Sequence, residues 1–74
     1  MAKQTILVVD RETDFLDWAK HQLEQAGPRV LTESTADAAY KTFCMEQPDL
    51  VLAEMNLNPF SGLELLGRIR KHSP

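Results

Sequence analysis

The chain is 74 residues long, 43% of them hydrophobic and 26% charged, which is typical of one small globular domain and excludes collagen-like, low-complexity and strongly disordered proteins. Eleven acidic against eight basic residues give a net charge of −3, so we expect no direct binding of nucleic acid through its phosphates. Apolar runs such as Ile6–Val9 are far shorter than the roughly 20 residues that span a bilayer. The single cysteine excludes an internal disulfide, and we therefore expect a cytoplasmic protein without a membrane segment.

The first half of the chain predicts a strand followed by a helix. Ile6–Val9 is short, apolar and half β-branched, which is typical of a strand buried on both faces of a parallel sheet. Apolar residues then recur at helical spacing and predict a helix over residues 13–26. Its apolar face comprises Phe15, Leu16, Ala19, Leu23 and Ala26. Thr13 or Asp14 would cap this helix, and Gly27-Pro28 would end it.

The second half of the chain repeats this alternation. Arg29–Glu33 predicts a weaker strand, and the pair Ser34-Thr35 offers a cap for the helix that follows. The apolar face of that helix comprises Ala36, Ala39, Tyr40, Phe43 and Cys44. Pro48 would end it, and Leu50–Ala53 predicts a third strand. A turn-rich loop at residues 56–61 leads to a last helix. The apolar face of the last helix comprises Leu63, Leu66 and Ile69.

This alternation of strands and helices predicts an α/β fold with a doubly wound parallel sheet and right-handed crossovers. A parallel sheet needs helices on both of its faces, and three strand–helix units provide little cover. Residues 1–74 therefore look like the front part of a larger domain, with only its first three βα units present.

Charged residues follow the first and third predicted strands. Asp10, Arg11 and Glu12 come directly after the first strand, and Glu54 comes directly after the third. Ligands of an open parallel sheet bind at the carboxyl ends of its strands. If the first and third strands are neighbours, these side chains would meet at one edge. Carboxylates at such an edge repel each other unless a cation lies between them. That cation could be a divalent metal ion with oxygen ligands or the guanidinium of Arg11.

Two separate motifs carry a resemblance to a known family. Ile6–Asp10 is similar to a first strand with its terminal acid, and Pro48–Leu52 followed by Glu54 is similar to the stretch that leads to a phosphoacceptor. Residues 61–66 and 68–70 are similar to the next loop and helix. The family is the response-regulator receiver domain of two-component signalling, and the resemblance covers nearly all of the chain. It implies a flavodoxin-like fold and a non-enzymatic module that regulates an output domain or a partner protein, such as one in transcription control.

The chain departs from this family at the residues that carry phosphorylation. The family's phosphoacceptor is an aspartate, whereas Glu54 stands at the matching position. A second acid that ligates magnesium usually follows the first strand, but Arg11 stands there, with Glu12 one residue later. Asp10 and the backbone carbonyl of Asn56 remain as metal ligands. The resemblance therefore implies weakened binding of Mg²⁺ and no certain cofactor.

We expect these substitutions to uncouple the domain from phosphorylation. Glu54 carries its carboxylate one methylene further out than an aspartate, which misplaces an attack that depends on sub-ångström positioning. Arg11 brings a fixed positive charge into the space that magnesium would use. An Arg11–Glu54 pair would then replace the magnesium–phosphoaspartate pair, and a protein partner would switch the domain. A histidine kinase is a doubtful partner of such a site.

Three other interpretations stay open from the residues alone. Asp10, Glu12 and Glu54 could be solvated acids at strand ends, with Arg11 directed to solvent. A second interpretation is an interaction or dimerisation module, in which the free edge of the third strand pairs two copies of the chain. The third is a small phosphotransfer enzyme, which has little support because only Asp10 is suitably placed.

Overall fold

Strands and helices alternate in the described part of the chain. The computed structural model describes residues 3–54 and 62–72. Its elements are β1 (Thr5–Val9), α1 (Thr13–Gln25), β2 (Arg29–Glu33), α2 (Ala36–Glu46), β3 (Leu50–Ala53) and α3 (Gly62–His72). Each predicted strand and helix is confirmed, whereas the predicted loop at residues 56–61 lies outside the described residues.

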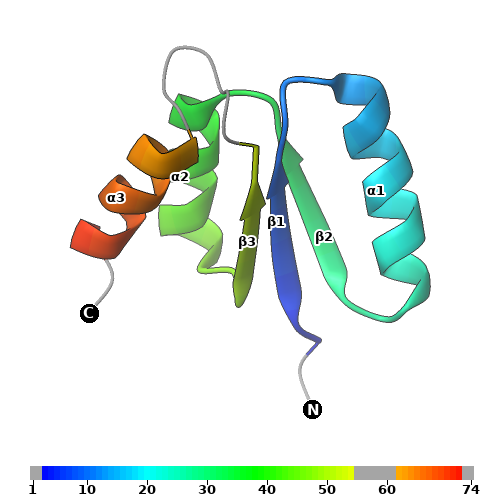
Figure 1. The fold of residues 1–74 in the computed structure, drawn as a ribbon. Coiled ribbons are helices and arrows are strands. Elements are labelled where there is room, and N and C mark those ends of the chain that lie inside the picture. The colour runs from blue at the N-terminus through cyan, green and yellow to red at the C-terminus, as the bar shows by residue number, and fades with distance from the viewer. Residues whose placement is uncertain (1–2, 55–61, 73–74) are drawn as a thin grey trace.

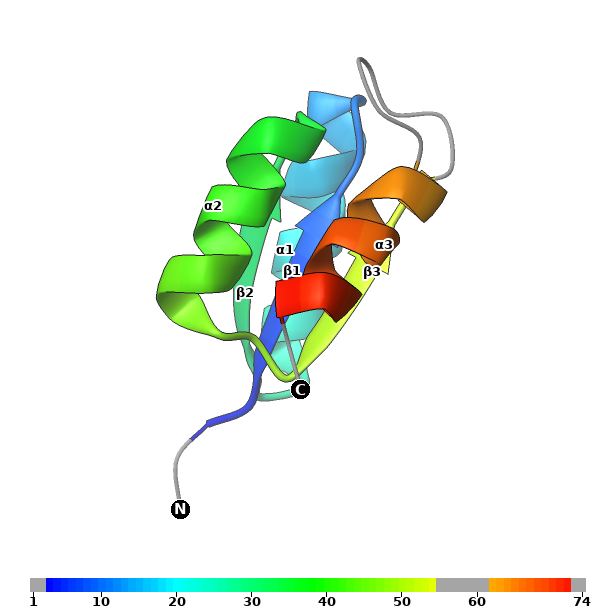
Figure 2. The same ribbon diagram turned by 90° about the vertical axis from the view of Figure 1, so that its left-hand side faces the viewer.

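The three strands form one parallel sheet in the order β2-β1-β3, with β1 in the centre (Figure 1). In the register of this sheet, Val8 of β1 lies opposite Thr32 of β2 and Leu52 of β3. Helix α1 covers one face of the sheet, and α2 and α3 cover the other (Figures 1 and 2). This arrangement confirms the prediction of a doubly wound parallel α/β fold.

Successive residues of β1 point to opposite faces of the sheet and enter two apolar clusters. Leu7 and Val9 belong to the cluster under α2 and α3, whereas Val8 packs with Leu16 and Val30 under α1. The other buried members of the first cluster are Ala36, Ala39, Leu65 and Ile69. The central strand is therefore buried on both faces, as its continuous apolar run predicts.

The edge strand β3 is less buried than the central strand β1. Val51 and Ala53 pack against the cluster under α2 and α3, but Leu50 and Leu52 are 49% and 43% exposed. Leu52 lies opposite Val8 and so on the face that α1 covers. Helix α1 packs against β1 and β2, and no described element covers the same face of β3 (Figure 1). The partial exposure of β3 follows from its place at the edge of the described sheet.

Contacts between α2 and α3 close the opposite face. The Arg68 guanidinium carbon lies 4.4 Å from the centroid of the Tyr40 ring, and Nη1 of Arg68 pairs with Oδ1 of Asp37 at 3.2 Å. Desolvation by burial raises the pKa of Tyr40 above its ordinary value, and a hydrogen bond with Cys44 acts in the same direction. Leu65 of α3 is fully buried beneath these contacts. The open face of the sheet is therefore the one beside α1.

The starts of α1 and α2 test the predicted caps. Glu12, rather than Thr13 or Asp14, is the residue before α1, and its side chain makes no capping hydrogen bond. The prediction for α1 was wrong because Thr13 is already in the helix. At α2, Oγ1 of Thr35 accepts a hydrogen bond from the N–H of Ala38 at 3.2 Å, which confirms the predicted cap.

Gly27 and Gly67 allow a matched test of backbone conformation. Gly27 follows α1 with a φ of +117°, whereas Gly67 lies inside α3, and an added Cβ would meet nothing within 4 Å at either position. We expect Gly27→Ala to lower the free energy of unfolding by more than about 1 kcal/mol, because side chains rarely adopt this φ. Gly67→Ala should raise it by about 0.5–1 kcal/mol. Urea unfolding measures both changes, and a stabilising Gly27→Ala would contradict the turn geometry.

Candidate functional site

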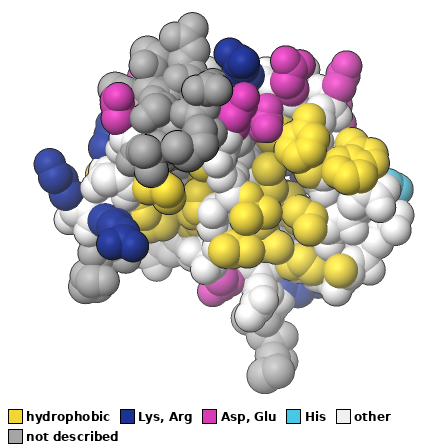
Figure 3. Space-filling model, viewed as in Figure 1, with side chains coloured by type: hydrophobic (Ala, Val, Ile, Leu, Met, Phe, Trp, Pro, Cys, Tyr) yellow, Lys and Arg dark blue, Asp and Glu magenta, His cyan; other side chains and the backbone are white. Residues whose placement is uncertain are grey.

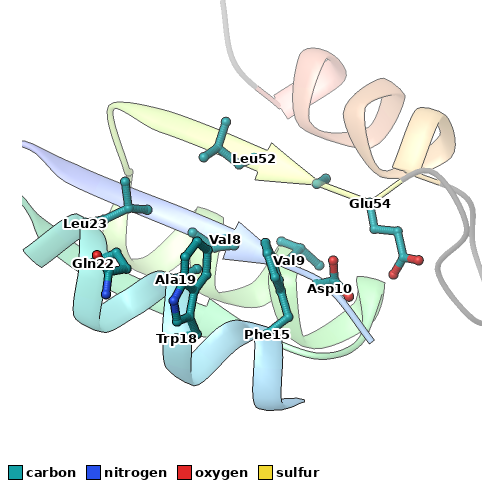
Figure 4. Close-up of a pocket in the computed structure, with 11 residues that line it drawn as sticks. Val8, Val9, Asp10, Phe15, Trp18, Ala19, Gln22, Leu23, Leu52 and Glu54 are labelled. Atoms are coloured by element: carbon teal, nitrogen blue, oxygen red, sulfur yellow. The ribbon is translucent and has the colours of Figure 1, made fainter. Parts of the chain in front are cut away.

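The carboxyl ends of β1 and β3 bring two acidic residues to the same edge of the sheet. The N–H of Asp10 donates to the carbonyl of Glu33 at 3.2 Å, and the N–H of Glu54 donates to the carbonyl of Val9 at 2.9 Å. These bonds continue the parallel ladder one residue beyond each strand. Figure 4 shows the carboxylates of Asp10 and Glu54 at one end of the same pocket. The sheet itself therefore places these two predicted site residues together.

Arg11 contacts the Glu54 carboxylate twice. Its backbone N–H donates to Oε2 of Glu54 at 3.2 Å, and its side-chain Nε lies 3.4 Å from Oε1. The Arg11 side chain is 57% exposed and that of Glu54 only 23%, so the acid is the more enclosed partner. The interpretation in which Arg11 points away into solvent therefore does not hold in this structure. Both oxygens of Glu54 are engaged by one residue of the loop after β1.

Asp10 shapes the start of α1 rather than taking part in this ion pair. Its Oδ1 accepts a hydrogen bond from the N–H of Glu12 at 2.9 Å, which makes a local turn before the helix. Among the described residues no cation pairs with the Asp10 carboxylate. Asp10 is half-buried and lines the pocket. It is therefore an anionic group that faces the pocket without a counter-charge from the described chain.

Glu12 does not join the other two acids. Its side chain is exposed, and it is not among the residues that line the pocket. The backbone of Glu12 makes its contacts instead. The Glu12 N–H donates a hydrogen bond to Oδ1 of Asp10, and the Glu12 carbonyl accepts one from the N–H of Leu16 at 3.1 Å. The sequence pattern placed Glu12 in an acidic pocket because it could not show where the helix begins. The pocket holds Asp10 and Glu54 without Glu12.

The described residues do not fit a magnesium site. They contain no group of three or more His, Cys, Asp and Glu side chains that could hold a metal ion. Of the carboxylates at the sheet edge, Glu54 is already paired with the Arg11 guanidinium. The predicted ligand Asn56 lies outside the described residues. Asp10 is thus the one predicted metal ligand that the structure describes.

The pocket extends from these acids along an apolar groove of about 410 Å³ between α1 and β3. Its walls include Phe15, Trp18 and Leu23 of α1 and Leu52 of β3 (Figure 4). The same face of the molecule shows a continuous hydrophobic area below a row of acidic side chains (Figure 3). Phe15 lies on the predicted apolar face of α1 with Ala19 and Leu23, but Phe15 is 44% and Trp18 60% exposed.

Sequence reasoning missed this groove. Phe15 and Trp18 stack with their ring centroids 5.9 Å apart, above a part of the sheet that no described helix covers. A bulky aromatic residue just outside the apolar stripe of α1 was the available signal, and Trp18 is that residue. The signal is weak because such residues more often pack at the margin of a core.

In the part of the chain that the structure describes, no helix is long and apolar enough to cross a membrane.

The Arg11–Glu54 pair should contribute little to stability. Because Arg11 is largely solvated, we expect Arg11→Gln to lower the free energy of unfolding by less than about 1 kcal/mol. Arg29→Gln, which breaks the comparable exposed pair with Glu46, is the matched control and should behave in the same way. Urea unfolding of both variants checks this. A loss of about 3 kcal/mol for Arg11→Gln alone would give the pair a structural role instead.

Comparison with known protein sequences identifies related domains. A sequence family described as the response regulator receiver domain matches residues 6–74. The chain is 32% identical over 65 residues to the transcriptional regulatory protein KdpE of Mycobacterium tuberculosis. That match covers 88% of this chain but only 29% of KdpE. The similarity therefore concerns one part of a longer regulator.

Solved structures agree with the sequence comparison. The receiver domain protein from Clostridium thermocellum superposes with a TM-score of 0.92 at 33% identity, over 96% of this chain and 58% of that one. A chain from the complex of histidine kinase ThkA with response regulator protein TrrA gives a TM-score of 0.86 at 35% identity, over 92% of this chain and 59% of that one. The chain thus spans about three-fifths of the solved chains that it matches.

Proposed function

The chain belongs to the response regulator receiver domain family, and from this we propose that it is a signalling module switched by a protein partner rather than by phosphorylation. The observation that carries the proposal is the double contact between Arg11 and Glu54 at the edge where the family's phosphoacceptor stands. The ion pair supplies opposite charges at this edge without a metal ion or a phosphoryl group.

Glu54 is poorly suited to receive a phosphoryl group. A carboxylate nucleophile needs a free oxygen in line with the bond that breaks, and both Glu54 oxygens lie against Arg11. Its extra methylene also moves the carboxylate away from the position that an aspartate would take. We infer that Glu54 holds the edge in one state through its charge and its contacts with Arg11.

Arg11 also opposes the binding of Mg²⁺ at this edge. A fixed guanidinium paired with the Glu54 carboxylate neutralises its charge and repels a second cation. Because the described residues do not fit a magnesium site, the proposal includes no metal-dependent step. It likewise includes no enzymatic turnover.

The proposed partner is an output domain or a separate regulatory protein. The match to KdpE, a transcriptional regulatory protein, supports a role in transcription control. The chain is also similar to a chain from a kinase–regulator complex, but phosphotransfer from a histidine kinase is not part of the proposal. The net charge of −3 argues against direct binding of nucleic acid by this domain. The single Cys44 thiol fits the reducing cytoplasm.

A second candidate function is pairing of two copies of the chain through β3. This strand pairs with β1 on one side and has no partner strand on the other among the described residues. Unpaired backbone groups of an edge strand are a template for pairing with another chain, and Leu50 and Leu52 add exposed apolar area beside them. Sedimentation equilibrium over a range of concentrations tests for this dimer.

Intact mass after incubation with acetyl phosphate and Mg²⁺ tests the proposal. We expect no mass increase on the unmodified chain under conditions in which a phosphorylatable receiver with an aspartate acceptor, used as positive control, is fully labelled. An adduct of one phosphoryl group that maps to Glu54 would overturn the proposal. The readout does not depend on what the output domain is.

A further inference from the structure

Three successive backbone amides hold the loop between β1 and α1, which comprises residues 10–12. The N–H of Asp10 donates to the carbonyl of Glu33 at 3.2 Å, and the N–H of Glu12 donates to Oδ1 of Asp10 at 2.9 Å. Between them, the N–H of Arg11 donates to Oε2 of Glu54 at 3.2 Å. Of these three acceptors, Glu54 is the one side chain that comes from outside the loop.

Helix α1 depends on this loop because its start has no side-chain cap. The first backbone bond of α1 runs from the N–H of Leu16 to the carbonyl of Glu12 at 3.1 Å, and the Glu12 side chain makes no capping hydrogen bond. Helix α2 begins with the same kind of bond, from Ala39 to Thr35, but there the Thr35 side chain also caps the helix. The N–H groups of a first helical turn have no partners within the helix. The start of α1 is therefore fixed by the backbone position of Glu12.

The two contacts between Glu54 and Arg11 differ in what they can restrain. The contact between Nε and Oε1 involves an Arg11 side chain that is 57% exposed, and a solvated ion pair restrains little. The hydrogen bond from the Arg11 N–H acts on the backbone and so restrains the loop itself. Glu54 is anchored in turn, because its own N–H donates to the carbonyl of Val9. Its carboxylate thus connects the end of the sheet to the middle of the loop.

We propose that Glu54 is a positioning residue that sets the start of α1. Its carboxylate holds the Arg11 backbone, which places the carbonyl of Glu12 to accept the first hydrogen bond of the helix. The proposal deepens the function proposed above and rests on it, because the loop and the first turn of α1 become the part of the domain that moves when a partner displaces the Glu54 carboxylate. It assigns this role to the reach of the Glu54 side chain rather than to its charge.

Amide hydrogen exchange, measured by NMR on the whole 74-residue chain, tests the proposal. Glu54→Asp keeps the charge but ends one methylene short of the Arg11 N–H, whereas Glu54→Gln keeps the reach and loses the charge. We expect Glu54→Asp to lower the protection of the Arg11 and Leu16 amides by about tenfold or more, because a hydrogen bond to a charged acceptor is lost. Glu54→Gln should lower it by no more than about threefold, since a neutral oxygen still accepts the bond at roughly half the strength.

Two further variants separate the backbone bond from the ion pair. Arg11→Gln removes the guanidinium and keeps the backbone N–H, so the Leu16 amide should stay protected to within about threefold. Glu46→Asp shortens the acid of the exposed pair with Arg29 by the same methylene and should not change the Leu16 amide. The Ala39 amide at the start of α2 is the internal control and should keep its protection in every variant.

Several results would overturn the proposal. A larger loss in Glu54→Gln or Arg11→Gln than in Glu54→Asp would show that charge, not reach, holds the loop. A loss at Arg11 without one at Leu16 would show that the loop does not set the start of α1, and an equal loss at Ala39 would reveal a change in global stability instead. A phosphoryl adduct on the unmodified chain would contradict the proposed function separately, because it changes none of these exchange measurements.

Discussion

Arg11→Asp combined with Glu54→Asp is expected to make the chain accept a phosphoryl group from acetyl phosphate in the presence of Mg²⁺. The double substitution removes the guanidinium that engages both Glu54 oxygens and shortens the acceptor by one methylene. The new carboxylate oxygen can then attack phosphorus while acetate leaves. Because a misplacement of about 1 Å costs roughly 100-fold in rate, we expect at least a 100-fold increase over the unmodified chain. Intact mass against time measures it.

The two single variants separate the causes. Glu54→Asp retains the Arg11 cation, and Arg11→Asp retains the longer acceptor, so each should remain at least tenfold slower than the double variant. Arg11→Gln with Glu54→Gln is the control for removal of the ion pair without an acid, and it should not be labelled. Labelling of Arg11→Asp but not of Glu54→Asp would show that the length of the Glu54 side chain is not the obstacle. A double variant that remains unlabelled would refute this account of the site.

Leu65→Ala should abolish the cooperative unfolding of the chain. Leu65 is fully buried in the cluster that joins α3 to Leu7 and Val9 of the central strand. Removing such a side chain costs about 2–5 kcal/mol, and a core of this size rarely supplies more than roughly 3–5 kcal/mol in total. We therefore expect the variant to lose its urea transition and most of its helical circular dichroism at 25 °C.

Leu66→Ala is the matched control for this change. Leu66 is the next residue of the same helix and is 39% exposed, so the same atoms are removed with little loss of packing. We expect it to lower the free energy of unfolding by less than about 1 kcal/mol. If both variants unfolded to the same extent, α3 would not dock through Leu65 as described.

The sequence by itself determined the order of the elements and the edge at which the charged residues meet. Ile6–Val9 and Leu50–Ala53 are predicted as strands because short apolar runs suit parallel sheets. The apolar residues between these runs recur at helical spacing and predict the helices. Residues that directly follow parallel strands must emerge at the same edge. Asp10 meets Glu54 because the strand order β2-β1-β3 also makes β1 and β3 neighbours, which the sequence pattern left open.

The tertiary structure decided what depends on the position of one element relative to another. That Leu52 is exposed follows from the place of β3 at the sheet edge, beyond the reach of α1, although its sequence resembles that of a central strand. The Glu12 side chain lies outside the pocket that holds Asp10 and Glu54, because α1 begins at Thr13 and uses the Glu12 backbone as its cap position. The hydrophobic pattern of a segment shows how apolar the segment is, whereas its burial depends on which neighbouring helices and strands cover it.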